Sequence, residues 1–171
     1  NREAHGRFGR IHLPVAARCN IACGFCDRRY ACVNESRPGV TAGLLSPEEA
    51  CELALRAAAR LPGLSVAGIA GPGDPLANPA ETFETLRLIR KVLPHLLLCL
   101  SSNGLALPEA AKEIADLGVG HMTVTVNAVN PAIGARIYRR VQGPDGPLSG
   151  EEGASLLLER QEVGIRRLKA L

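Results

Sequence analysis

The sequence predicts an α/β fold in which about four strand–helix units form part of a (β/α) barrel. Segments typical of strands and of helices alternate along the chain, which implies right-handed crossovers and a parallel sheet. Each predicted strand is followed by a loop that carries cysteine, glycine or polar residues. Ligand sites of barrel folds lie at these carboxyl ends of the strands. Because the sequence stops on a predicted helix, we expect residues 1–171 to be one domain that lacks the last barrel strands.

Four segments are predicted to be strands. The first, Arg10–Ala17, is short and contains Pro14, a residue that is awkward in a central strand. The second, Leu64–Ala70, is an apolar run typical of a buried parallel strand. The last two are predicted at Leu96–Leu100 and His121–Val126.

Helix signals fill the segments between these strands. Ser46 is an expected N-cap, followed by Pro47 at the first helical position and by the capping-box residue Glu49. This helix is expected to end near Pro62, before a glycine. Further helices are predicted at Pro79–Val92, Pro108–Leu117, 131–138 and Gly150–Leu171, with a polar loop at Arg139–Ser149.

Composition excludes several classes of protein. Hydrophobic residues make up 46% of the chain and aromatic residues only 3%, so the core must be aliphatic. A net charge of +3, from 20 basic and 17 acidic residues, is too balanced for a nucleic-acid-binding surface. No run approaches the roughly 18 apolar residues of a membrane span. The six cysteines are clustered within a βα pattern, which favours reduced thiols in a cytoplasmic metalloprotein over disulfides.

The loop after the first strand carries the most informative motif. Cys19, Cys23 and Cys26 are spaced C-x3-C-x2-C, and Cys32 follows six residues later. Thiolates are ligands for zinc and for iron–sulfur clusters. A closed zinc site or an electron-transfer [4Fe-4S] cluster normally takes four protein ligands, so three ligands leave one metal position open for chemistry.

This motif, directly after a first strand, resembles the radical S-adenosylmethionine (SAM) superfamily. The resemblance implies a barrel of radical SAM type in which the three thiolates hold a [4Fe-4S] cluster and SAM occupies the open iron. One electron from the cluster would cleave SAM to a 5′-deoxyadenosyl radical. Phe25 matches the aromatic position beside the cluster and adenine, although a phenylalanine can also simply pack in a core.

The same resemblance assigns contacts with SAM to the loops after the other strands. From the residues alone, each of these positions can also be explained by a turn or by strand propensity. The positions that match the superfamily's contacts are Gly71, Gly73, Asp74, Ser102, Asn103, Thr125, Asn127 and Ile137.

Longer segments resemble one group within this superfamily, the enzymes that build the iron–molybdenum cofactor of nitrogenase. The matching segments are CNIACGFCDRRYACVNESRPGV, IAGPGDPLANPAETFETLRL, LCLSSNGLALPEA and TVTVNAVNPAIGARIY. The resemblance implies fusion of two further [4Fe-4S] substrate clusters, with SAM as both methyl donor and radical source. The product would be an eight-iron cluster with a central carbide. The implied partners are an iron–sulfur cluster donor and carrier or scaffold proteins of the nitrogenase pathway.

Residues for the substrate clusters follow from this second resemblance. Cys32 matches a ligand of one substrate cluster, Cys99 a ligand of the other, and Glu35 an acidic residue that could bind iron or move a proton. On the residues alone, Cys32 could be a spare thiol and Cys99 a buried strand residue. Cys51 matches no ligand and is interpreted as packing. The group's other ligands fall outside residues 1–171, and Arg139–Ser149 lacks the aromatic residues usual there, so we expect this chain alone to be inactive.

Two other functions remain open at this stage. One is a radical SAM enzyme that acts on an organic substrate, in which Cys32 and Cys99 would be dispensable. The other is a non-catalytic iron–sulfur carrier or zinc-binding module, which would neither bind nor cleave SAM.

Overall fold

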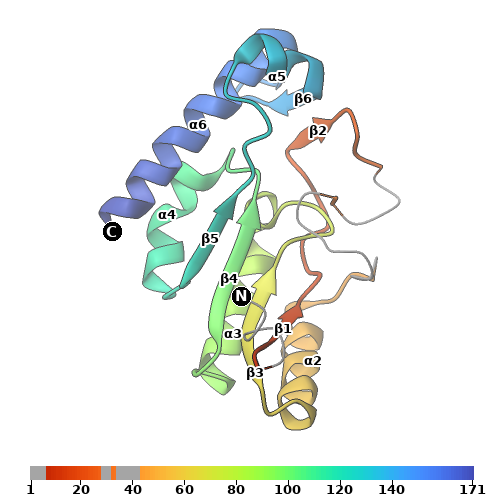
Figure 1. Cartoon of the computed structure of the whole chain (residues 1–171), viewed down its shortest axis with the longest axis vertical. Coiled ribbons are helices and arrows are strands. Elements are labelled where there is room, and N and C mark those ends of the chain that lie inside the picture. The colour runs from red at the N-terminus through yellow and green to blue at the C-terminus, as the bar shows by residue number, and fades with distance from the viewer. Residues whose placement is uncertain (1–6, 28–31, 34–42) are drawn as a thin grey trace.

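A single parallel sheet forms the body of the computed structural model, which describes residues 7–27, 32–33 and 43–171. Its strands lie in the order β1-β3-β4-β5, and all neighbouring pairs are parallel. Sequential order with parallel pairing is the pattern of a (β/α) barrel rather than of a doubly wound sheet. The predicted α/β fold and partial barrel are therefore confirmed (Figure 1). The strands are β1 (Gly9–His12), β3 (Leu64–Ile69), β4 (Leu97–Ser102) and β5 (His121–Val124).

The helices connect these strands and begin and end close to the predicted residues. Helix α2 starts after the complete capping box of Ser46 and Glu49, in which each side chain accepts a hydrogen bond from the other residue's backbone N–H. A proline stands at the first or second position of each helix from α2 to α5. The helices are α2 (Pro47–Arg60), the 3-10 helix η1 (Pro75–Ala77), α3 (Pro79–Val92), α4 (Leu107–Asp116), α5 (Pro131–Ile137) and α6 (Gly150–Ala170).

The main core lies between the sheet and the helices. Leu98 and Leu100 on β4 are fully buried and pack in the same cluster as Leu86 and Ile89 of α3. Because side chains alternate along a strand, Cys99 points to the opposite face of the sheet from these two leucines. Cys51 on α2 is buried in the main core cluster, as its interpretation as a packing residue predicts.

A second sheet corrects the sequence prediction. The predicted polar loop at Arg139–Ser149 is wrong, because β6 (Tyr138–Gln142) and β7 (Pro147–Leu148) form antiparallel strands there. The partner of β6 is β2 (Ile21–Cys23), inside the cysteine loop. This pairing joins segments more than a hundred residues apart, so local sequence patterns carry no sign of it.

The first strand also differs from the prediction, since β1 ends at His12 instead of Ala17. The chain nevertheless continues along β3, because the N–H groups of Leu13 and Ala16 donate to the carbonyls of Gly68 and Gly71. Pro14 lacks an N–H group and so interrupts the ladder. The irregular segment after β1 leads directly to the cysteine loop.

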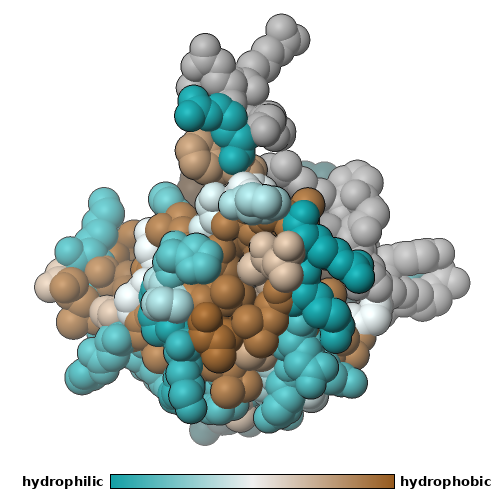
Figure 2. Space-filling model, turned by 90° about the horizontal axis from the view of Figure 1, so that it is seen from below, coloured by the Kyte–Doolittle hydropathy of each residue, from teal (hydrophilic) through white to brown (hydrophobic). Residues whose placement is uncertain are grey.

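The end of the molecule seen from below has apolar surface at its centre and hydrophilic side chains around it (Figure 2). Among the residues the structure describes, no helix is both long and apolar enough to span a bilayer.

Candidate functional site

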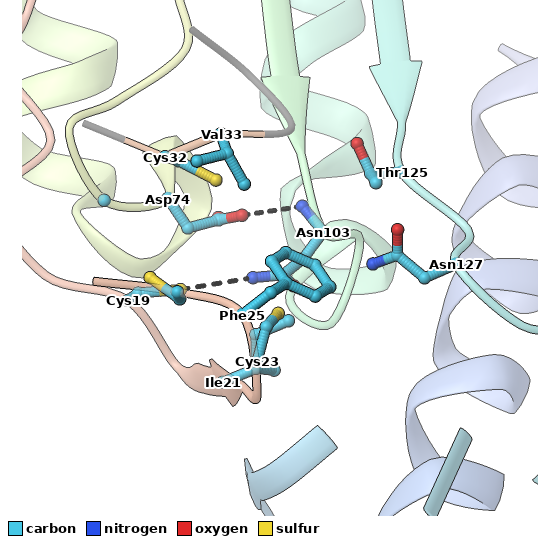
Figure 3. Close-up of a pocket in the computed structure, with 12 residues that line it drawn as sticks. Cys19, Ile21, Cys23, Phe25, Cys32, Val33, Asp74, Asn103, Thr125 and Asn127 are labelled. Carbon is cyan, nitrogen blue, oxygen red and sulfur yellow. Dashed lines mark hydrogen bonds between the residues drawn. The ribbon is translucent and has the colours of Figure 1, made fainter. Parts of the chain in front are cut away.

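A single pocket gathers most of the residues that the sequence analysis selected. Its enclosed volume is small, about 30 Å³, and the pocket opens to solvent. The loops after β1, β3, β4 and β5 all contribute, as expected at the carboxyl ends of barrel strands (Figure 3). The lining residues are Cys19, Ile21, Cys23, Phe25, Cys26, Cys32, Val33, Gly73, Asp74, Asn103, Thr125 and Asn127.

The second sheet holds the cysteine loop over this pocket. β2 pairs with β6 on one side, and the N–H of Gly24 donates to the carbonyl of Ile137 at 2.7 Å. The N–H of Cys26 donates to the carbonyl of Cys23 at 3.1 Å, which closes a tight turn between these two thiols. Phe25, in this turn, is 48% exposed and lines the pocket, so it is not a core residue.

The four thiols of the pocket are electrostatically coupled. Burial raises the pKa of Cys23 to about 12, and repulsion from Cys19, Cys32 and Cys26 acts in the same direction. Without a cation, Cys23 therefore stays a neutral thiol at pH 7. Metal binding to such a site must release protons, and a positive iron centre removes the repulsion between thiolates.

Three thiols of the cysteine loop can serve as ligands of one iron–sulfur cluster. Across the described part of the chain, no three His, Cys, Asp or Glu side chains are gathered to hold one metal ion. Three thiolates on one zinc would lie only about 3.8 Å apart, given a zinc–sulfur distance of about 2.3 Å. In a [4Fe-4S] cluster each thiolate binds a different iron, so the sulfurs are spread more widely. Cys19, Cys23 and Cys26 come from one loop and line one pocket, as the ligands of one cluster must.

The loop after β3 approaches the cysteine loop so closely that only glycine fits at position 73. A Cβ atom on Gly73 would lie 2.2 Å from the carbonyl oxygen of Arg18, which directly precedes Cys19. The Gly73 N–H instead donates to the carbonyl of Ala16 at 2.6 Å. The side chain of Asn78, 2% exposed, accepts from the N–H of Arg18 and donates to its carbonyl, as a strand partner would.

Asp74 joins this loop to the loop after β4. Its carboxylate, 3% exposed, accepts hydrogen bonds from the hydroxyl of Ser102 and from the N–H groups of Leu76 and Asn103. An ionised carboxylate with several donors is a stable buried arrangement. Asp74 lines the pocket, but these contacts make it mainly a link between two strand ends.

The end of β5 contributes Thr125 and Asn127 to the pocket. The Thr125 N–H donates to the carbonyl of Ser102, and the Asn127 N–H donates to the hydroxyl of Tyr138 at 3.3 Å. The buried amide of Gln161, on α6, donates to the backbone carbonyls of both Asn103 and Thr125. Gln161 was missed by the sequence analysis, where it is one polar residue of an amphipathic helix.

Several predicted site residues lie outside the lining of this pocket. Ser102 is fully buried, and its hydroxyl is used by Asp74 and by the N–H of Gly104. Gly71 offers its carbonyl to Ala16, and Ile137 offers its carbonyl to Gly24. Glu35 lies outside the described residues.

Cys99 is 4% exposed and lies on the inner face of the sheet, away from the pocket lining. The strand register pairs His12 with Gly68, Gly68 with Cys99 and Cys99 with His121, so the four form one row. Because paired residues share a face, His12 and Cys99 flank a position that has no side chain. The sequence analysis missed His12, because a single histidine in a predicted strand does not indicate a site. Its place in one row with Cys99 follows only from the register of three strands.

Comparison with known proteins agrees with this geometry. The sequence profile of the Radical SAM superfamily matches residues 13–148. The chain belongs to the radical SAM superfamily. Membership implies a [4Fe-4S] cluster and SAM as cofactors, and the thiols described above are the residues that fit the cluster.

Within the radical SAM superfamily, the chain is similar to proteins named FeMo cofactor biosynthesis protein NifB. It is 52% identical to that of Klebsiella pneumoniae over 170 residues, which is 99% of this chain and 36% of the relative. Identity is 47% with the protein of Chlorobaculum tepidum, covering 99% of this chain and 40% of the relative. It is 46% with that of Azotobacter vinelandii, covering 98% and 33%. The chain thus spans between a third and two fifths of the length of these curated relatives.

Proposed function

We propose that this chain is the radical SAM core of an enzyme that assembles the iron–sulfur precursor of the nitrogenase FeMo cofactor. The observation that carries this proposal is the fourth thiol, Cys32, which lines the same pocket as Cys19, Cys23 and Cys26. A radical SAM cluster needs three thiolates, so a fourth beside it suits a second metal-containing group. Identities of 46–52% with proteins named for FeMo cofactor biosynthesis support this assignment.

Cys19, Cys23 and Cys26 would hold the resident cluster in this proposal. When bound, that cluster supplies one electron for the reductive cleavage of SAM. Phe25 offers an apolar ring at the half-exposed edge of the pocket, where it can cover an adenine. Thr125, Asn127 and the backbone of Gly73 offer polar groups on the other walls of the pocket for the remainder of SAM.

Two [4Fe-4S] clusters are the proposed substrates, with a carbon atom from the methyl group of SAM as the future carbide. Cys32 is the proposed ligand of one substrate cluster. Cys99, on the inner face of the sheet, is the proposed ligand of the other substrate cluster. His12 lies in the same row on the far side of Gly68 and is proposed to add an imidazole ligand. Thiolate and imidazole are both good iron ligands. Glu35 is proposed to assist near Cys32 as an iron ligand or proton carrier.

Iron counts on matched cysteine variants test this assignment. The full-length protein, reconstituted without oxygen, is expected to lose the SAM-cleaving cluster in Cys23→Ala. It should keep that cluster and lose other iron in Cys32→Ala. Cys51→Ala, a variant of the core cysteine, is the control and should bind as much iron as the parent. Equal iron in Cys32→Ala and Cys51→Ala would contradict a substrate-cluster role for Cys32.

Product analysis separates this function from its alternatives. The assay uses the full-length protein, because this chain alone is expected to be inactive. Dithionite and SAM should then yield both 5′-deoxyadenosine and S-adenosylhomocysteine, since one SAM gives a radical and another gives a methyl group. 5′-Deoxyadenosine alone, unaffected by Cys32→Ala and Cys99→Ala, would favour an organic substrate. An intact cluster without SAM cleavage would favour an iron–sulfur carrier. We further propose that a cluster donor and nitrogenase cofactor carriers or scaffolds are the partners, which pull-downs with candidate proteins can test.

A further inference from the structure

Asn103, the first residue after β4, has a side chain whose polar atoms are all engaged. Its Oδ1 accepts a hydrogen bond from the N–H of Leu105 at 2.9 Å. Its Nδ2 donates to Oδ1 of Asn20 at 2.7 Å and approaches Sγ of Cys19 at 3.7 Å (Figure 3). A contact of this length is a normal hydrogen bond when the acceptor is sulfur, which is larger than oxygen. Asn103 is only 7% exposed, so these contacts form away from bulk water.

The orientation of the Asn103 amide follows from its partners. The backbone N–H of Leu105 can only donate, so the oxygen of the amide must face it. The two N–H groups of the amide must then face Asn20 and Cys19. Rotation of the amide by 180° would place two donors against each other at Leu105 and two acceptors at Asn20.

The backbone of Asn103 is also held on both sides. Its N–H donates to the carboxylate of Asp74 at 2.7 Å, and its carbonyl accepts from the amide of Gln161 at 2.7 Å. Both partners are nearly inaccessible to solvent. A residue fixed at both backbone groups and at both ends of its amide presents its N–H to Cys19 in one geometry.

We propose that Asn103 is a positioning residue that holds the Cys19 thiolate and raises the reduction potential of the cluster bound by the three cysteines. The proposal rests on the proposed function, because it takes Cys19 as a cluster ligand. An N–H donor draws electron density from a thiolate and so favours the cluster that carries one more electron. Asn103 also lines the pocket, so the contact with SAM expected from the sequence stays a separate prediction.

Two alanine variants at the ends of one hydrogen bond test the proposal. Asn103→Ala removes the donor to Cys19 together with the bond to Asn20. Asn20→Ala removes only the bond between the two asparagines and leaves the donor to Cys19 in place. All variants also carry Cys32→Ala and Cys99→Ala, so that the three-cysteine cluster is the one titrated. The full chain is reconstituted, and its cluster is titrated with dithionite, without SAM, by electron paramagnetic resonance.

Asn103→Ala should lower the ratio of reduced to oxidised cluster at a given potential by about tenfold, which is about 59 mV for a one-electron couple. Asn20→Ala should change that ratio less than twofold. Asn103→Asp keeps an oxygen for Leu105 but replaces the donor by a carboxylate, so it should lower the ratio further.

The remaining outcomes would overturn the proposal. Equal potentials in the parent, Asn103→Ala and Asn103→Asp would show that Asn103 does not act on the cluster, and the proposed function would stand. Equal shifts in Asn103→Ala and Asn20→Ala would assign the effect to the bond between the asparagines. Loss of the cluster in both Asn103 variants would leave Asn103 a purely structural residue. A parent that assembles no cluster would remove this inference and the proposed function together.

Discussion

The side-chain amide of Gln161 donates a hydrogen bond of 2.7 Å to the backbone carbonyl of Asn103, 58 residues earlier in the chain. The same Nε2 atom donates to the carbonyl of Thr125 at 3.0 Å. Helix α6 thus joins the ends of β4 and β5 behind the pocket. Both carbonyls belong to pocket-lining residues, so a helix that contributes nothing to the pocket lining still determines the distance between two of its walls.

Replacing Gln161 should therefore destabilise the protein more than replacing an exposed polar residue of the same helix. Gln161→Leu keeps the size of the side chain but leaves two carbonyls without their donor, which should cost about 2–3 kcal/mol in the free energy of unfolding. Urea unfolding of the reduced, cluster-free chain measures this cost. Glu159→Leu adds the same leucine on the exposed face of α6 and should change stability by about 0.5 kcal/mol or less. Similar costs for both variants would contradict the bridging role.

Asp74→Asn tests the link between the loops after β3 and β4. An amide in place of the carboxylate presents its own N–H group to a neighbouring donor, so one of the N–H groups of Leu76 and Asn103 loses its acceptor. We expect a loss of about 1–3 kcal/mol in unfolding free energy. The exposed Asp145 provides a control, since Asp145→Asn should have almost no effect. The result would speak against the link if the two variants unfolded at the same urea concentration.

Gly73→Ala should prevent the close approach of the β3 loop to the cysteine loop. The new methyl group would lie 2.2 Å from a backbone oxygen of Arg18, which cannot move without displacing Cys19. We expect a loss of about 3 kcal/mol and reduced iron binding after reconstitution. Gly9→Ala is the matched control, because its Cβ would meet neighbours at 3.5 Å, an ordinary contact. Normal iron binding by Gly73→Ala would show that the loops can separate without harm.

Two N-cap serines allow a test of the capping box. Ser46 accepts from the N–H of Glu49, whereas Ser149 caps α6 without a side-chain hydrogen bond. Ser46→Ala should therefore cost about 1 kcal/mol of stability, and Ser149→Ala only a few tenths. Thermal unfolding of both variants, followed by circular dichroism, checks the difference. Equal melting temperatures would mean that the capping hydrogen bond contributes little.

Local patterns were sufficient for the elements of the barrel. The boundaries of α3 match the prediction at both ends, because Pro79 and the apolar spacing that follows it are local signals. The cysteine motif was equally readable, since its three thiols lie within eight residues. The pairing of β6 with β2 could not be predicted, because it joins segments more than a hundred residues apart. Tyr138 and Val141 of β6 are buried in one cluster with Ile21 of β2.

The sequence by itself determined the α/β order, the ends of the helices and the thiols available to metal, because each depends on residues close together in the chain. Only the tertiary structure decided how these residues cooperate. It placed Asn103 against Cys19, set Gln161 behind two pocket walls and aligned His12 with Cys99 across Gly68. These relationships depend on strand register and helix packing between distant segments, and no local pattern encodes either one.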